Sequence, residues 1–159
     1  MRKIWLLGLL ALLLGCSAPT TREQTIDELV AQRNVQTFFP LPSKTYASFD
    51  AGHGYQLEYL SSNGLAYLWY PGNQRVVLGE WKGVLDEICY KYGSNTVNSQ
   101  TVQRGGSWEC TFVGRLQTFT VGYAEGDLFE LQSGNVPYVR SKCDLPEGIR
   151  RLKKVSCSP

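Results

Sequence analysis

The sequence predicts a mainly β protein, an antiparallel meander curled into a small barrel or half-barrel, with a short N-terminal helix. From Tyr55 onward, aromatic and β-branched residues occur in short runs. Gly, Asn, Ser or Pro occurs in nearly every gap between these runs. Six or seven such runs follow one another within roughly 80 residues, and closing or covering the sheet edges would prevent aggregation. A β-sandwich is the alternative.

The first 15 residues have the pattern of an export signal. Arg2 and Lys3 precede the apolar run from Ile4 to Leu14, which is too short to cross a hydrocarbon core of about 30 Å. The run ends in Leu13-Leu14-Gly15-Cys16, which resembles the lipobox of bacterial lipoproteins. The resemblance implies a diacylglycerol thioether and N-acylation on Cys16. By similarity to enterobacterial sorting, Ser17 favours the outer membrane, facing the periplasm.

Removing this segment changes the charge balance. The whole chain has 16 basic and 14 acidic residues. Without Arg2 and Lys3, residues 16–159 carry 14 of each and are formally neutral. This balance argues against nucleic-acid binding driven by bulk charge.

Three segments are expected after the signal. Residues 16–24 form a polar, lipidated tether. Residues 25–45 hold a short helix and an arm. Thr25 and Glu28 fit a capping box at the start of the helix, Asn34 can end it, and Pro40 and Pro42 impose the extended arm. Residues 46–159 form one β domain.

Turn residues divide the β domain into seven expected strands. The clearest hairpin surrounds Asn63-Gly64, because this pair supplies the positive φ angles of a tight turn. The expected strands are Tyr55–Leu60, Leu65–Tyr70, Gln74–Trp81, Glu87–Tyr92, Ser107–Val113, Leu116–Tyr123 and Leu128–Gln132.

Four cysteines in the β domain predict two disulfides in an oxidising compartment. They are Cys89, Cys110, Cys143 and Cys157. Three pairings are possible. Pairing Cys89 with Cys110 and Cys143 with Cys157 is favoured because each bridge closes a short segment, and the second would clamp the C-terminal tail.

Three regions are candidates for binding. The polar loop from Gly93 to Gly106, with Asn95, Asn98 and Arg104, would be stapled at its base by Cys89 and Cys110. The dense aromatic residues either form the core or pave a binding surface, and Trp69-Tyr70, just before a turn, is expected to be their most exposed part. The C-terminal twenty residues carry a net +4 charge and either meet anionic lipid headgroups or are simply solvated. The candidate contact residues of this C-terminal segment are Arg150, Arg151, Lys153 and Lys154.

A run of short motifs resembles small uncharacterised lipoproteins of Gram-negative bacteria. It covers about 60 residues and includes Asn63-Gly64, Trp69-Tyr70-Pro71-Gly72-Asn73, Gly79-Glu80-Trp81, Ile88-Cys89-Tyr90 and Trp108-Glu109-Cys110. The resemblance implies a lipocalin-like topology and brings no activity with it. Gly79-Glu80-Trp81 also matches the Gly-x-Trp signature of true lipocalins. There the signature lies on the first strand, whereas here two strands precede it.

The residues that could carry catalysis are sparse. Asp50-Ala51-Gly52-His53-Gly54 resembles the Asp-x-Gly-His-Gly motif of zinc-dependent cell-wall amidases. A catalytic zinc needs about three protein ligands and His53 is the chain's single histidine, so we expect a turn. Two strand carboxylates in one cleft could act as a glycosidase acid and base, although solvated ones are commoner. These are Glu58, Glu80, Glu109 and Glu130.

Together these patterns predict a lipid-anchored envelope protein that works by binding and has no catalytic residue, metal or cofactor. Its expected partners are the membrane, through Cys16, and an envelope protein, a glycan or a lipid. A lipocalin-like carrier of a small apolar ligand and an inhibitor of a cell-wall hydrolase are the alternatives.

Overall fold

A computed structural model describes residues 40–97, 104–134, 136 and 140–157. The predicted signal peptide, Cys16, the tether, the N-terminal helix and Asn98 lie outside the described residues.

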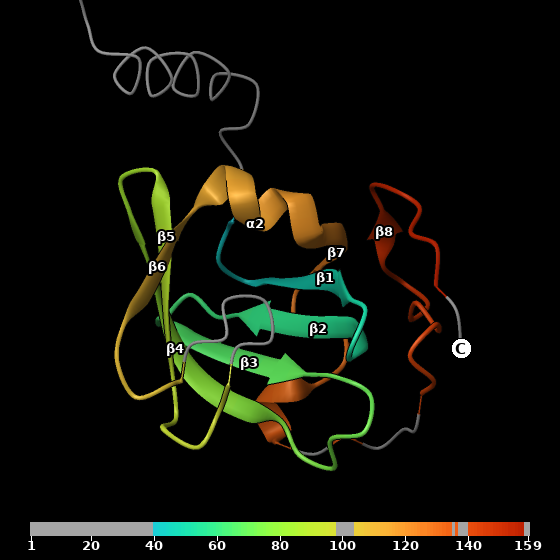
Figure 1. Cartoon of the computed structure of the whole chain (residues 1–159), viewed down its shortest axis with the longest axis horizontal. Helices are drawn as coiled ribbons and strands as arrows, with labels where there is room; N and C mark the ends of the chain where they lie inside the picture. The colour runs from blue at the N-terminus through green and yellow to red at the C-terminus, as the bar shows by residue number, and fades with distance from the viewer. Residues whose placement is uncertain (1–39, 98–103, 135, 137–139, 158–159) are drawn as a thin grey trace, which may run out of the picture. The chain divides into compact units, whose positions relative to one another are not determined.

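One antiparallel sheet dominates the described chain (Figure 1). Its strand order is β6-β5-β4-β3-β2-β1-β7-β8. The strands are β1 (Lys44–Asp50), β2 (Gly54–Leu60), β3 (Leu65–Trp69), β4 (Val77–Val84), β5 (Glu87–Tyr92), β6 (Glu109–Phe112), β7 (Thr120–Glu125) and β8 (Arg150–Arg151). The mainly β class and the meander are confirmed. The closed barrel is wrong, because β7 pairs with β1 and β8 pairs with the free side of β7, so β6 and β8 remain as separate edges.

Within the described residues, one α-helix interrupts the meander. The helix, α2 (Val113–Phe119), takes up the first half of the predicted strand Leu116–Tyr123, and only Thr120 onward is extended. In Figure 1, α2 crosses from the end of β6 to the start of β7 along the upper side of the sheet. Val113 and Leu116 pack against the core there. Their three-residue spacing puts both side chains on one face of the helix. The chain has to pass from β6, at one edge of the sheet, to β7, on the other side of β1, and a single strand would not make this connection.

Two further elements differ from expectation. Leu128–Gln132 is not a strand, because the carboxylate of Asp127 accepts 2.8 Å hydrogen bonds from the amides of Leu131 and Gln132 and starts a short 3₁₀ helix, η1 (Leu131–Ser133). The sequence predicts no strand before Tyr55, yet β1 pairs on both sides, with β2 and with β7.

The sheet buries side chains on both faces. The first face carries Leu57, Trp69 and Val121 under the C-terminal segment, which contributes Leu145 and Ile149. The second face carries Tyr46, Leu60, Ala66 and Ile88, together with Tyr90, Tyr92 and α2. Residues of opposite faces alternate along each strand, so a single sheet supports two cores.

Two turns have backbone conformations that restrict sequence. Gly54, at the β1–β2 turn, has φ +82°, and an added Cβ would lie 2.3 Å from the carbonyl oxygen of Lys142. Leu85, in the β4–β5 turn, has φ +56° without being glycine, a conformation that L-residues adopt at a cost.

Both disulfides have the pairing that the sequence favoured. Cys89–Cys110 joins residues that lie directly opposite each other on β5 and β6. Cys143–Cys157 closes the C-terminal segment on itself, with a sequence separation of 14. Disulfides of this kind indicate an extracytoplasmic compartment.

Candidate functional site

A small pocket opens on the second face of the sheet, beneath α2. Its polar lining comes from Tyr46, Ser48, Glu58, Tyr90 and Thr120, and its apolar lining from Pro40 and Leu116. The β1–β2 register places Tyr46 directly opposite Glu58. The volume is about 30 Å³, enough for about two water molecules at roughly 10–15 Å³ each. We call it the Glu58 pocket.

Glu58 is a carboxyl group without a cationic partner among the described residues. Its Oε1 accepts a hydrogen bond from the hydroxyl of Tyr92. Burial raises the pKa of Glu58, while the hydroxyls of Tyr92 and Tyr90 oppose that rise. The ion pairs of the described chain involve other carboxylates. A buried carboxylate in this situation either holds its proton or requires a positive charge beside it.

Tyr90 has an unusual hydroxyl. Its oxygen is buried and has no partner with good hydrogen-bond geometry within the described structure, although a looser contact with Glu58 lowers the pKa of Glu58 and raises that of Tyr90. Burial is the main cause that raises the pKa of Tyr90 well above the usual value, and the charge of Glu58 adds to it. A buried hydroxyl without a well-formed hydrogen bond is costly, so a ligand that supplied one would be favoured in the pocket.

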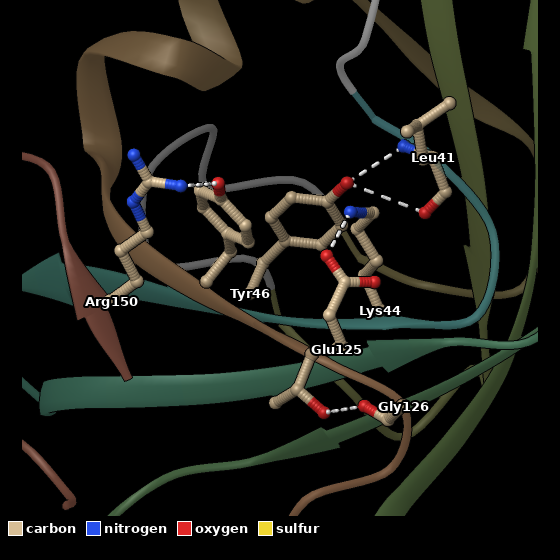
Figure 2. Close-up of polar contacts among 8 residues, drawn as sticks. Leu41, Lys44, Tyr46, Glu125, Gly126 and Arg150 are labelled. Carbon is tan, nitrogen blue, oxygen red and sulfur yellow. Dashed lines mark hydrogen bonds and ion pairs between the residues drawn. The ribbon is translucent and has the colours of Figure 1, made fainter. Parts of the chain in front are cut away.

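Tyr46, which lines the pocket, is held by hydrogen bonds to Leu41 (Figure 2). Its hydroxyl accepts a 2.7 Å hydrogen bond from the amide of Leu41 and donates to the Leu41 carbonyl oxygen at 3.3 Å. Burial raises the pKa of Tyr46 to about 12, so the group stays a neutral donor. Beside it, Lys44 pairs with Glu125 and Arg150 donates to the hydroxyl of Tyr123 at 2.9 Å.

A second surface lies on the opposite side of β4, β5 and β6. Lys82, Cys89 and Cys110 form one row of the ladder there. The ammonium of Lys82 lies 4.2 Å from the centre of the Trp108 ring, and that of Lys91 lies 6.0 Å from it. Trp108 remains 38% exposed. Cation–π contacts from these two lysines stabilise an indole that stays partly solvent-accessible. We call this surface the disulfide face.

The disulfide face continues into an apolar tip. Val84, Glu87 and Phe112 form the next row of the ladder, and Leu85 is in the adjoining turn. Leu85 is 91% exposed and Phe112 is 51% exposed. Exposed apolar side chains on one face of neighbouring strands are typical of interaction sites.

The predicted binding loop is described only at its base. Val97 and Arg104 form an isolated bridge, and the amide of Gly106 donates to the carbonyl of Tyr92 at 2.8 Å. An added Cβ on Gly105 would collide with the Gly93 carbonyl at 2.3 Å, so the base closes tightly. Asn95 and Arg104 are exposed there.

The prediction that Trp69-Tyr70 is exposed is wrong for Trp69. Its side chain is 1% exposed in the first core, and its indole N–H donates to the Asn73 carbonyl at 2.9 Å. Tyr70 is half-buried and packs against His53, with 4.5 Å between ring centres. The turn after β3 folds back and buries the tryptophan, which the position before a turn alone does not reveal.

The four basic candidates of the tail are all exposed, and two of them make contacts. Arg150 contacts Tyr123, and Lys153 donates to the carbonyls of Gln117, at 3.3 Å, and Thr118. Lys153 therefore satisfies free carbonyls at the end of α2, where a cation is favourable. Arg151 and Lys154 are exposed.

The Asp50–Gly54 motif forms a turn. Asp50 Oδ1 accepts hydrogen bonds from the amides of Gly52 and His53 at 2.9 and 3.0 Å, and lies 3.2 Å from the His53 ring nitrogen Nδ1. In the part of the chain that is described, His, Cys, Asp and Glu side chains do not gather in threes around any point where a metal ion could bind.

The four strand carboxylates do not share a cleft. Glu58 is the carboxylate that lines the pocket, while Glu80 is exposed and pairs with Lys91 at 3.2 Å. Glu130 precedes η1, where it has a positive φ. No two of these carboxylates line the Glu58 pocket.

Sequence reasoning missed the partnership of Tyr46, Glu58, Tyr90 and Tyr92. A signal was present, because Glu58 interrupts an otherwise uncharged strand, and Tyr90 and Tyr92 lie two apart and so share a face. Bringing them together requires the register of β1, β2 and β5, which turn residues alone do not give.

Comparisons with protein-family models, curated proteins and solved structures gave no match to this chain. In the described residues, α2 and η1 are far too short to span a membrane. The Glu58 pocket and the disulfide face are therefore the features from which a function can be inferred.

Proposed function

We propose that this chain is a lipid-anchored protein of the cell envelope that acts by binding an envelope protein partner, without catalysis. The disulfides support export, and the lipobox-like sequence ending at Cys16 supports an anchor. Acylation of Cys16 would hold the domain at the outer membrane, facing the periplasm.

The disulfide face is the observation that carries this proposal. It joins exposed Trp108, Phe112 and Leu85 to the cations Lys82 and Lys91. Aromatic side chains are enriched at protein interfaces and act as anchors there. The Cys89–Cys110 bridge fixes the strands that carry them, so little ordering is needed upon binding.

The carrier alternative has less support. The Glu58 pocket has a volume of about 30 Å³, whereas sites for small ligands usually measure about 300–1,000 Å³. Inhibition of a cell-wall hydrolase is a special case of the proposal, in which the loop from Gly93 to Gly106 would enter the partner's active site. Deleting residues 98–103 without any change in partner binding would contradict that special case.

In-cell cross-linking tests the proposed interface. A photoreactive amino acid is placed at Leu85 or Phe112, with Gln132, an exposed residue of η1, as the matched control position. We expect one discrete protein adduct from positions 85 and 112, identified by mass spectrometry. The adduct should be absent from position 132 and reduced by Cys16→Ala.

Identical adducts from all three positions would contradict the proposed interface, and so would their absence from positions 85 and 112. A further variant, Trp108→Ala, should weaken the adduct at position 112 while lowering the midpoint of thermal unfolding less than Trp69→Ala does. An undiminished adduct would show that Trp108 is not part of the interface.

A further inference from the structure

The Glu58 pocket combines groups that the proposed interface does not use. It lies on the second face of the sheet, under α2, whereas the interface lies on the other side of β4, β5 and β6. Its carboxylate has no cationic partner in the described chain, and one of its hydroxyls has no well-formed hydrogen bond. Both features mark a place where a ligand would complete the bonding.

We propose that the Glu58 pocket binds the primary ammonium group of an aliphatic amine. The carboxylate of Glu58 supplies the opposite charge, and the hydroxyl oxygen of Tyr90 accepts one ammonium hydrogen. Tyr46 and Tyr90 are also among the lining residues, and tyrosine rings attract cations to their faces. The hydroxyls of Ser48 and Thr120, on the same lining, offer further acceptors.

The geometry selects a primary ammonium over other cations. The pocket has a volume of about 30 Å³, which admits a terminal –CH₂–NH₃⁺ group in place of about two water molecules. A trimethylammonium group is bulkier and has no N–H to donate.

Charge considerations agree with this assignment. The titratable groups that act on Glu58 are Tyr90 and Tyr92, from β5, while Tyr46 faces it from β1. The pocket receives Leu116 from α2 and Thr120 from β7, neither of which is charged. An incoming ammonium would therefore be the positive charge that lets the buried carboxylate ionise.

Calorimetric titration tests the assignment on the full chain, purified in a non-ionic detergent and an amine-free buffer. The probe is n-butylammonium, with tetramethylammonium and n-butanol as comparison ligands. We expect saturable one-site binding of n-butylammonium and at least tenfold weaker binding of both comparison ligands. Equal binding of n-butanol would overturn the proposal, because an apolar contact would then explain it.

Two variants locate the site. Glu58→Gln should weaken n-butylammonium binding at least tenfold, and Tyr90→Phe should weaken it to a smaller extent. Glu80→Gln removes an exposed carboxylate outside the pocket and should leave binding unchanged. Tyr90→Phe keeps the ring volume and removes a hydroxyl without a well-formed hydrogen bond, so it should fold even if Glu58→Gln does not. Unchanged binding by Tyr90→Phe and Glu58→Gln would overturn the assignment.

Proton release provides an independent readout. Titrations at pH 5 in two buffers with different ionisation heats measure the protons released on binding. We expect n-butylammonium to displace a proton from the wild-type chain and none from Glu58→Gln. The same amine group ends a lysine side chain and an ethanolamine headgroup, so Nα-acetyl-lysine amide and phosphoethanolamine, titrated separately, distinguish the two sources.

Discussion

The two faces of the sheet are made from the same strands but differ in chemistry. The face under the C-terminal segment is closed by Leu57, Trp69, Val121 and Leu131, all nearly inaccessible to solvent. The face under α2 keeps Glu58, with a raised pKa, and the hydroxyl of Tyr90, which has no well-formed hydrogen bond. Burial of apolar side chains stabilises the first face, whereas the second face retains polar groups at a cost in stability.

The largest expected effect comes from opening the closed face. Trp69→Ala removes a side chain that is 1% exposed, and large-to-small changes of this kind cost about 3–5 kcal/mol. We expect a loss of this size in the free energy of unfolding, measured by urea denaturation. Trp108→Ala, at a partly exposed ring, should cost less than half as much. Equal losses would show that the part of this face around Trp69 is no better packed than the part around Trp108.

The next effect comes from loosening the cover of the closed face. Leu145, Ile149 and Val155 pack on the first core and lie within the segment that Cys143–Cys157 closes. Replacing both cysteines by serine should cost about 3 kcal/mol, by the chain-entropy estimate for a loop of about 15 residues.

Hydrogen exchange would show where the loss of this disulfide acts. Amides of the C-terminal segment, such as that of Leu152, which donates to the Val121 carbonyl at 2.8 Å, should lose protection first. Protection of β5 should change less, because the Cys89–Cys110 bridge remains. Uniform loss across the sheet would contradict a local role for the clamp.

The sequence anticipated what depends on neighbours along the chain. Glu87–Tyr92 has its predicted bounds, and the Asn63-Gly64 turn and both disulfides also follow from local patterns. The sequence did not predict the features that depend on contacts between distant parts of the chain. Strand β1 is stabilised from both sides, Trp69 is covered by distant segments, and the Glu58 pocket exists only once β1, β2, β5 and α2 are assembled.

The free energy of unfolding should depend on pH because of Glu58 on the second face of the sheet. Because burial raises the pKa of Glu58, the folded state binds this proton more tightly than the unfolded state. The resulting stability is fully present below the ordinary glutamate pKa and is lost as the pH rises toward the pKa of the folded state. Each unit of elevation is worth about 1.4 kcal/mol.

Glu58→Gln removes this titration. Between pH 4 and pH 7, we expect the free energy of unfolding of the wild-type chain to fall relative to that of Glu58→Gln in amine-free buffer. Urea denaturation of both chains at pH 4, 5.5 and 7 measures the difference. Parallel pH profiles would mean that Glu58 titrates as an exposed glutamate does.

The smallest effect concerns a residue that belongs to neither core. Leu85 has φ +56° and is 91% exposed, in a hairpin turn where Asn or Gly is favoured. Leu85→Asn should therefore stabilise the domain by about 0.5–1 kcal/mol, through relief of backbone strain, measured by urea denaturation. The same variant should weaken the cross-link from position 112, because it removes an apolar side chain from the proposed interface. Increased stability with an unchanged cross-link would mean that Leu85 does not contribute to binding. A decrease in stability would mean that the leucine is held by contacts that outweigh the strain of its turn.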